Sequence, residues 1–166
     1  MTKTSFSNMS GFLTEIQNAK LRANAGKGAD MARVEMERKN ILDLNILVGI
    51  DVSGSISSTM FKTFMTQLNM IKGMSQIKVV EVGDKIEAVY DFSKPAARIA
   101  RLGGGGGNGE HLFFPLAKRM RPDAILYMTD GHCTSANDPK IPTGWILTAA
   151  GQVPYPWGAL VGRLPH

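Results

Sequence analysis

A carboxylate and two hydroxyls alternate directly after one apolar stretch of the sequence. The stretch "NILVGID" ends at Asp51, and the motif "DVSGS" then adds Ser53 and Ser55. A short, nearly continuous apolar stretch rich in β-branched residues predicts a strand buried on both faces. Carboxylate and hydroxyl oxygens at such a strand end are typical ligands of a hard cation. The alternative is that Asp51 and the two serines cap the helix that follows.

A second apolar stretch ends in a similar way. In "AILYMTDG", Thr129 and Asp130 follow another predicted strand. In a parallel sheet the carboxyl ends of the strands meet at one edge, so these residues are expected beside Asp51. Taken alone, Asp130 before Gly131 is also consistent with a simple turn. Two aspartates at strand ends of one sheet favour a shared site.

Five consecutive glycines, Gly103 to Gly107, lie between these two motifs in "RLGGGGGNGEH". Glycine permits positive φ and close backbone approach, which favours a loop folded around a ligand over a linker. The phosphate-binding pattern G-x-x-x-x-G-K-[ST] is absent because no lysine follows. The glycines do not follow a first strand either, as a dinucleotide-binding loop would.

The sequence contains no recognisable catalytic motif. Neither G-x-S-x-G nor H-E-x-x-H occurs, so we expect a protein that is not an enzyme. The single cysteine, Cys133, cannot form an internal disulfide and favours a reducing compartment. No stretch of about 18 apolar residues and no secretion signal are found. We therefore expect a cytoplasmic protein (in the host cytoplasm if phage-encoded).

Strands and helices alternate along most of the chain. Apolar patterns predict strands at 44–53, at 77–92 as a hairpin around residues 83–85, at 124–131, 143–150 and 158–164, and helices at 57–74, 95–102 and 110–120. This order predicts an α/β fold with three layers, a mostly parallel twisted sheet and one antiparallel edge strand.

The first 42 residues have a different pattern. Phe12, Leu13 and Ile16 recur at helical spacing, with Ser10 as the expected N-cap, and a second helical pattern covers residues 29–40. We predict a helical N-terminal extension at residues 1–42 and one α/β domain at residues 43–166.

Five motifs in order resemble one known family. "DVSGS", "LGGGGGN", "RPDAILYMTDG" and the pair "GWILTAAG" and "WGALVGRL" are similar to the motifs of VWA-like domains, relatives of the von Willebrand factor A domain with its metal-ion-dependent adhesion site (MIDAS). The resemblance covers residues 44–164 and is strongest to the type found in bacteria and phages. That type is often linked to a peptidase part, which this sequence lacks.

The resemblance implies a set of metal ligands. Asp51, Ser53 and Ser55 would hold Mg²⁺, Mn²⁺ or Ca²⁺ directly or through water. Asp130 would bind through water or hydrogen bonds. The threonine of the family falls at Asn108, which is a departure, although an asparagine carbonyl can still ligate these ions.

Three further residues are possible accessories of this site. Glu110 would supply another carboxylate ligand; the alternative is that it only interacts, as a negative charge at a helix N-terminus, with the helix dipole. Thr129 accompanies Asp130. His132 is either in contact with a ligand or an exposed loop histidine.

By resemblance, the expected function is that of a metal-dependent protein-binding module. A partner's carboxylate would complete the coordination of the ion, and relatives suggest a MoxR-type AAA+ ATPase as that partner. A homo-oligomer formed through the N-terminal helices is a further alternative. The alternative is a basic, phage-type protein that binds single-stranded DNA on a scaffold with a degenerate metal site, because the net charge is +5.

Overall fold

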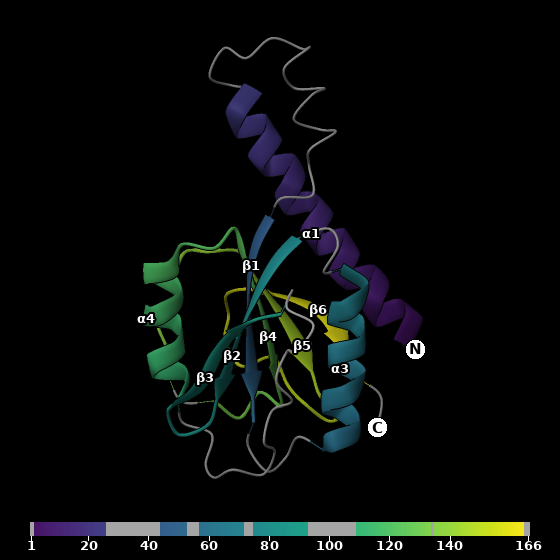
Figure 1. The fold of residues 1–166 in the computed structure, drawn as a ribbon, viewed down its shortest axis with the longest axis vertical. Coiled ribbons are helices and arrows are strands. Elements are labelled where there is room, and N and C mark those ends of the chain that lie inside the picture. Colours follow the sequence, from purple (N-terminus) through teal and green to yellow (C-terminus); the bar gives the residue numbers. More distant parts are fainter. Residues whose placement is uncertain are drawn as a thin grey trace.

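A computed structural model describes residues 2–25, 44–52, 57–71, 75–92, 109–133 and 135–164 (Figure 1). The described elements follow in the order α1 (Thr2–Ala25), β1 (Leu44–Asp51), α3 (Ser58–Ile71), β2 (Ser75–Val82), β3 (Ile86–Asp91), α4 (Glu110–Met120), β4 (Ala124–Thr129), β5 (Thr143–Leu147) and β6 (Ala159–Arg163). Every strand predicted from the sequence is present. The predicted helices at 29–40 and 95–102 lie outside the described residues.

The described strands form one sheet in the order β3-β2-β1-β4-β5-β6. Neighbouring strands are parallel except for β2 and β3, which pair antiparallel. The antiparallel strand β3 therefore lies at an edge, and the predicted α/β fold is confirmed. Because the other strands all run the same way, they end at one side of the sheet, which we call the C-terminal edge.

Helices cover both faces of this sheet, so the fold has three layers (Figure 1). On one face, Phe61, Phe64 and Leu68 of α3 join Met9 and Leu13 of α1 in a single core cluster. α4 lies on the opposite face with a separate cluster. The predicted layering follows from the spacing of these apolar residues, which places them on one side of each helix.

The α4 face is dominated by aromatic rings. Phe113 and Phe114 pack edge-on against each other with ring centroids 5.0 Å apart, and Tyr127 of β4 lies 4.9 Å from Phe113. Trp145 of β5 lies 6.2 Å from Phe114. Large rings in edge-to-face contact stabilise a core beyond their buried area. This packing holds α4 in place although Pro115 lies inside the helix.

α1 begins earlier than expected. The helix starts at Thr2, so Ser10 lies inside it and the predicted N-cap is wrong. Met9 is fully buried, which shows that the face of α1 that packs on the sheet begins before Ser10. None of the described helices is both long and apolar enough to cross a membrane. The predicted domain boundary at residue 42 lies outside the described residues and stays a prediction.

β1 is central in the sheet and buried on both faces. Ile46, Val48 and Ile50 face α1 and α3, whereas Leu47 belongs to the cluster under α4. This alternation is the period of two expected for a strand. Flanked by β2 and β4, the strand is buried at every position except Asn45, as the apolar sequence of residues 46–50 predicts.

Gly49 is the one position of β1 where a side chain would not fit. It pairs with Tyr127 of β4, whose ring lies across it. A Cβ at Gly49 would lie 2.5 Å from Cε2 of Tyr127 and 2.9 Å from Cε2 of Phe113. The glycine therefore allows the aromatic cluster to lie directly on the central strand.

We expect Gly49→Ala to lower the free energy of unfolding by about 1–3 kcal/mol, because the added methyl overpacks the core. Urea denaturation followed by far-UV circular dichroism measures the change. Gly11→Ala is the matched control, because a Cβ at Gly11 in α1 has nothing within 4 Å. That variant should gain about 0.5–1 kcal/mol from helix propensity. Unchanged stability of Gly49→Ala would contradict the packing of Tyr127 on β1.

Candidate metal site

The ends of β1 and β4 bring the first two predicted residues together. The two strands are parallel neighbours with Ile50 opposite Met128, so Asp51 and Thr129 come next in each strand. Thr129 Oγ1 donates a hydrogen bond of 3.1 Å to Asp51 Oδ2, and both residues are buried. A buried carboxylate is stable only when such partners satisfy it. This bond holds the Asp51 carboxylate at the C-terminal edge.

Asp130 lies in a tight turn directly after Thr129. Its Oδ1 accepts a hydrogen bond of 2.9 Å from the backbone N–H of His132, and the N–H of Gly131 donates to Thr129 Oγ1 at 3.1 Å. Gly131 has a φ of 87°. The turn interpretation of Asp130 is therefore correct as local geometry. It is compatible with a metal role, because a carboxylate can accept a backbone bond and still contribute to a cation site.

The loop after β5 supports this turn. The N–H of Thr148 donates to Thr129 O at 3.1 Å, and the N–H of Gln152 donates to Asp130 O at 3.0 Å. A Cβ on Gly131 would collide with the backbone oxygen of Gln152, so the two loops are in close contact. The geometry of Thr129 and Asp130 thus depends on a segment about twenty residues further along the chain.

Arg163 of β6 fixes that supporting loop in turn. Its Nη1 donates to the backbone oxygens of Gly151 at 2.6 Å, Thr148 at 3.2 Å and Ala149 at 3.3 Å. A guanidinium is suited to this role because its donors point in fixed directions. No motif in the sequence singled out Arg163, and its segment was predicted only as a strand. Its signal was a cation at the C-terminal end of an otherwise apolar strand.

Glu110 is the first residue of α4 and is fully buried. The preceding Gly109 donates its N–H to the backbone oxygen of Gly83 at 2.8 Å, so the start of α4 lies against the β2–β3 turn. An acidic residue in the first turn interacts favourably with the helix dipole, as one of the two interpretations predicts. An interaction with the helix dipole does not require Glu110 to be buried, because a charged side chain at a helix end is ordinarily exposed to solvent.

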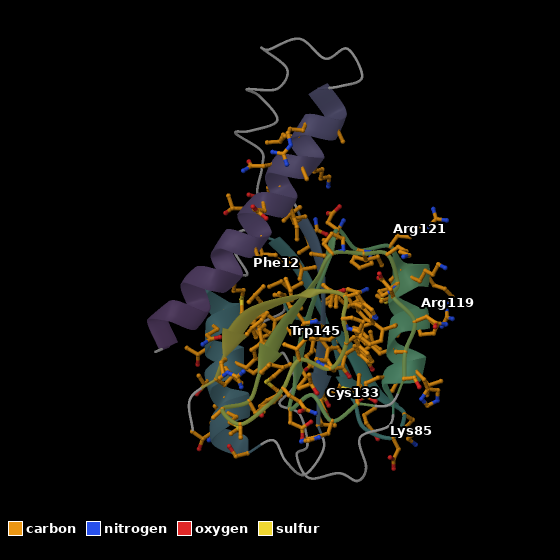
Figure 2. The ribbon with its side chains drawn as sticks, turned by 180° about the vertical axis from the view of Figure 1, so that it is seen from behind. Phe12, Lys85, Arg119, Arg121, Cys133 and Trp145 are labelled. Atoms are coloured by element: carbon orange, nitrogen blue, oxygen red, sulfur yellow. The ribbon has the colours of Figure 1, made fainter. Side chains whose placement is uncertain are left out.

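The negative charges of Glu110 and Asp51 act on two neighbouring groups. Burial, and then the charges of Glu110 and Asp51, raise the pKa of Tyr127 well above its usual value of 10.0. Burial also raises the pKa of Cys133 to about 12, with both carboxylates adding to the effect and a hydrogen bond with Thr129 opposing it. The sulfur of Cys133 lies 3.5 Å from Thr129 Oγ1. Figure 2 labels Cys133 near this end of the molecule. These groups form one buried polar cluster at the C-terminal edge.

The remaining predicted residues divide into two groups. His132 is exposed, as the loop interpretation predicts. Ser53, Ser55 and Asn108 lie outside the described residues. Among the residues that the structure does describe, no group of three or more His, Cys, Asp or Glu side chains is placed to hold a metal ion. The described part of the site is therefore Asp51 with Thr129 and Asp130, and Glu110 is buried near them.

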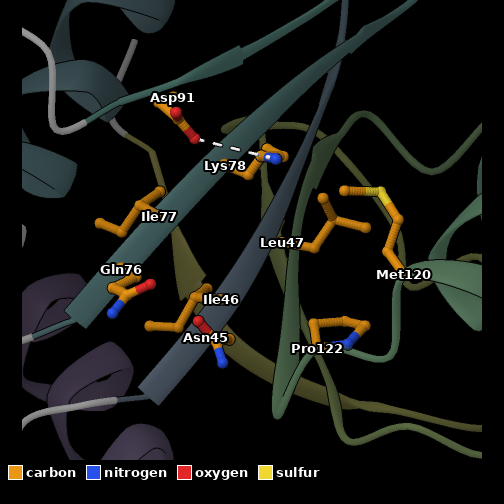
Figure 3. Close-up of a pocket in the computed structure, with 9 residues that line it drawn as sticks. All are labelled: Asn45, Ile46, Leu47, Gln76, Ile77, Lys78, Asp91, Met120 and Pro122. Atoms are coloured by element: carbon orange, nitrogen blue, oxygen red, sulfur yellow. Dashed lines mark ion pairs between the residues drawn. The ribbon is translucent and has the colours of Figure 1, made fainter.

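A pocket at the opposite edge of the sheet contains none of these residues. It has a volume of about 310 Å³ and lies where β1, β2 and the end of α4 meet (Figure 3). Lys78 and Asp91 form an ion pair of 3.9 Å in its wall, and Leu47 and Met120 supply its apolar side. It is thus separate from the candidate metal site.

β1 from residue 46 onward, β4 and the turn at Asp130 all lie in a stretch of sequence that matches a known family. The profile of the family described as "VWA-like domain (DUF2201)" matches residues 46–162, which is more than half of the chain. The chain belongs to the VWA-like domain family. The match to the VWA-like domain extends from β1 into β6 and does not include α1. No curated protein matches the chain.

We expect the Cys133 thiol to react slowly. With its pKa raised to about 12, it stays protonated in the folded protein, and only the thiolate reacts readily. Alkylation by iodoacetamide at pH 8 should be at least about tenfold slower in the folded chain than in concentrated urea. Mass spectrometry of the alkylated fraction measures this.

The raised pKa of Cys133 also makes the stability of the folded protein depend on pH. The unfolded thiol loses its proton near pH 9, whereas the folded thiol keeps it up to about pH 12. Stabilisation from this group is therefore complete below about pH 9 and is lost as the pH rises toward 12. Equal alkylation rates in the folded and unfolded chain would contradict the burial of Cys133.

Proposed function

We propose that this VWA-like domain is a metal-dependent protein-binding module. The observation that carries the proposal is the hydrogen bond between Thr129 and Asp51, which joins the ends of two adjacent parallel strands. Asp130 follows directly in a braced turn. In open parallel sheets, this edge is where ligands bind.

The types of donor present fit a hard cation. Asp51 and Asp130 supply carboxylate oxygens and Thr129 a hydroxyl, while Ser53 and Ser55 would add two hydroxyls from the loop after β1. Mg²⁺, Mn²⁺ and Ca²⁺ all prefer such oxygen ligands. When bound, the cation would offer a coordination position to a carboxylate of a partner protein. Thr129 would keep Asp51 oriented through its hydroxyl, and the loop braced by Arg163 would keep Asp130 in place.

Asn108 and Glu110 decide how this site differs from the family pattern. Asn108 stands where the family has a threonine. Glu110 is buried near the Asp51 charge, and its carboxylate would add to the negative potential that attracts a cation. We propose that Glu110 offsets the weaker ligand at position 108.

A binding role is favoured over catalysis by the groups at the site. Cys133 is protonated at neutral pH and is therefore a poor nucleophile. His132 is exposed, and its backbone rather than its ring bonds to Asp130. By family resemblance, a MoxR-type AAA+ ATPase in the cytoplasm is the proposed partner.

The charges of the described residues bear on the alternative of DNA binding. Among the side chains that the structure describes, basic and acidic residues occur in equal numbers. The excess of positive charge in the whole sequence therefore comes from residues outside this part. Three of these acidic residues, Asp51, Glu81 and Glu110, are buried, so the described surface carries more basic than acidic side chains and DNA binding stays a prediction.

The test compares the response of Asp51→Asn and wild type to metal. Asparagine keeps the shape of Asp51 and can still accept a bond from Thr129, but it removes the charge. MgCl₂ or MnCl₂ at ten times the dissociation constant should stabilise the wild type by about 1.4 kcal/mol. Asp51→Asn should lose most of this gain, as measured by thermal unfolding across a metal titration.

Asp91→Asn is the matched control, because Asp91 is an aspartate at the opposite edge in an exposed ion pair with Lys78. Exposed pairs contribute little to stability, so this variant should respond to metal like the wild type. An identical metal response in Asp51→Asn and Asp91→Asn would contradict the proposed site. So would a wild type that responds to none of Mg²⁺, Mn²⁺ and Ca²⁺.

A further inference from the structure

A second surface feature begins beside the candidate metal site. A groove of about 360 Å³ runs between α4 and the chain at residues 135–139, and we call it the α4 groove. Its α4 side carries His111, Phe114, Pro115 and Lys118, and its other side includes Ala136 and Pro139. None of these residues belongs to the proposed metal site. The volume lies within the range of pockets that bind small ligands or parts of a peptide.

Each of the two walls of the α4 groove follows, in the sequence, a residue of the candidate metal site. His111 follows Glu110, which lies at the C-terminal edge, and residues 135–139 follow the Asp130 turn after a few residues. Lys118 is two turns further along α4, toward the opposite edge. A segment that starts at the metal site can therefore enter the groove at His111 and leave it at Lys118.

The floor of the α4 groove is apolar and well supported. The Phe114 ring lies edge-on to Trp157 at 5.2 Å and to Tyr155 at 6.1 Å. Tyr155 and Trp157 are themselves stacked at 4.8 Å with an angle of 1° between their planes. A floor held by ring contacts loses little entropy when a ligand binds, which favours an apolar side chain above it.

The charges of the α4 groove favour an acidic ligand. Lys118 is an exposed cation at its far end. The one carboxylate in the wall, Asp138, already accepts a hydrogen bond of 2.8 Å from the N–H of Lys140, and the Lys140 ammonium lies 3.6 Å from it. The negative charge of Asp138 is therefore compensated locally. The charge with which the groove can attract a bound segment is therefore the positive charge of Lys118.

The length of the groove sets the spacing of that occupant. His111 and Lys118 are seven positions apart, which corresponds to about 10 Å along a helix. An extended peptide covers this in about three residues. We take one further peptide residue to span from His111 to the metal-binding carboxylate, so that an acid at Lys118 falls about four positions from that carboxylate.

We propose that the α4 groove binds the segment of the partner that flanks its metal-binding carboxylate. This segment is extended, with an apolar residue about two positions from that carboxylate and a second acidic residue about four positions from it. The inference rests on the proposed metal-dependent function and adds the chemistry of the partner to it.

The probe is the peptide acetyl-Glu-Gly-Leu-Gly-Glu-amide, whose sequence reads the same in both directions, so that chain polarity does not affect the test. Binding to the full chain is measured by NMR titration at low salt with MgCl₂. Lys118→Glu should weaken peptide binding at least about fivefold, since it replaces an attraction by a repulsion. Lys118→Gln should weaken it less. Replacing the leucine of the peptide by glycine should also weaken binding.

Lys62→Glu is the matched control, because Lys62 is an exposed lysine on α3, on the other face of the sheet. It should leave the dissociation constant of the peptide within about twofold of wild type. Thermal unfolding with MgCl₂ verifies that each variant is folded and still responds to metal.

Several results would overturn the inference. These are unchanged peptide binding in Lys118→Glu, equal weakening in Lys118→Glu and Lys62→Glu, and undiminished binding when EDTA replaces MgCl₂. A wild type that responds to Mg²⁺ but does not bind the peptide would also overturn it, while leaving the proposed metal site intact. A wild type without any metal response would instead contradict the proposed function itself.

Discussion

The enclosure of β1 is the constraint on which the rest of this structure depends. The strand has neighbours on both sides and apolar cores on both faces, so its register cannot shift without exposing one of them. That fixed register places Asp51 opposite the end of β4. The hydrogen bond from Thr129 then follows from the pairing of the two strands, and the buried carboxylate is held by the same contacts that hold the sheet.

Much of this arrangement was predictable from the sequence, because its main causes are local. Apolar stretches with β-branched residues give the strands, and the hairpin around Gly83 gives the antiparallel edge. The juxtaposition of Asp51 with Thr129 required one further assumption, that the two strands are neighbours. The VWA-like motifs supported it. The sequence predicted a mostly parallel sheet with one antiparallel edge strand but not the order of its strands, although parallel strands joined by helices obey few topologies.

Other features depend on contacts between distant residues and could not be predicted in this way. The full burial of Glu110 depends on how α4 docks against the β2–β3 turn, which no local pattern contains. Ser10 resembles an N-cap in sequence, but the burial of Met9 extends α1 beyond it, so tertiary packing outweighed the local signal. The bonds of Arg163 to three backbone oxygens depend on a loop conformation that only the folded chain defines.

The position of Arg163 also has a consequence for the order of folding. The turn at Asp130 is braced by the loop after β5, and that loop is held by a side chain of β6, which lies far from Asp51 in sequence. Such long-range contacts form late, because closing a long loop costs entropy before any contact repays it. During synthesis, the chain must emerge through β6 before this turn is secured. A nascent chain that lacks β6 can pair β1 with β2 while the C-terminal edge is still unformed, so the turn at Asp130 takes its final shape only when the sheet is complete.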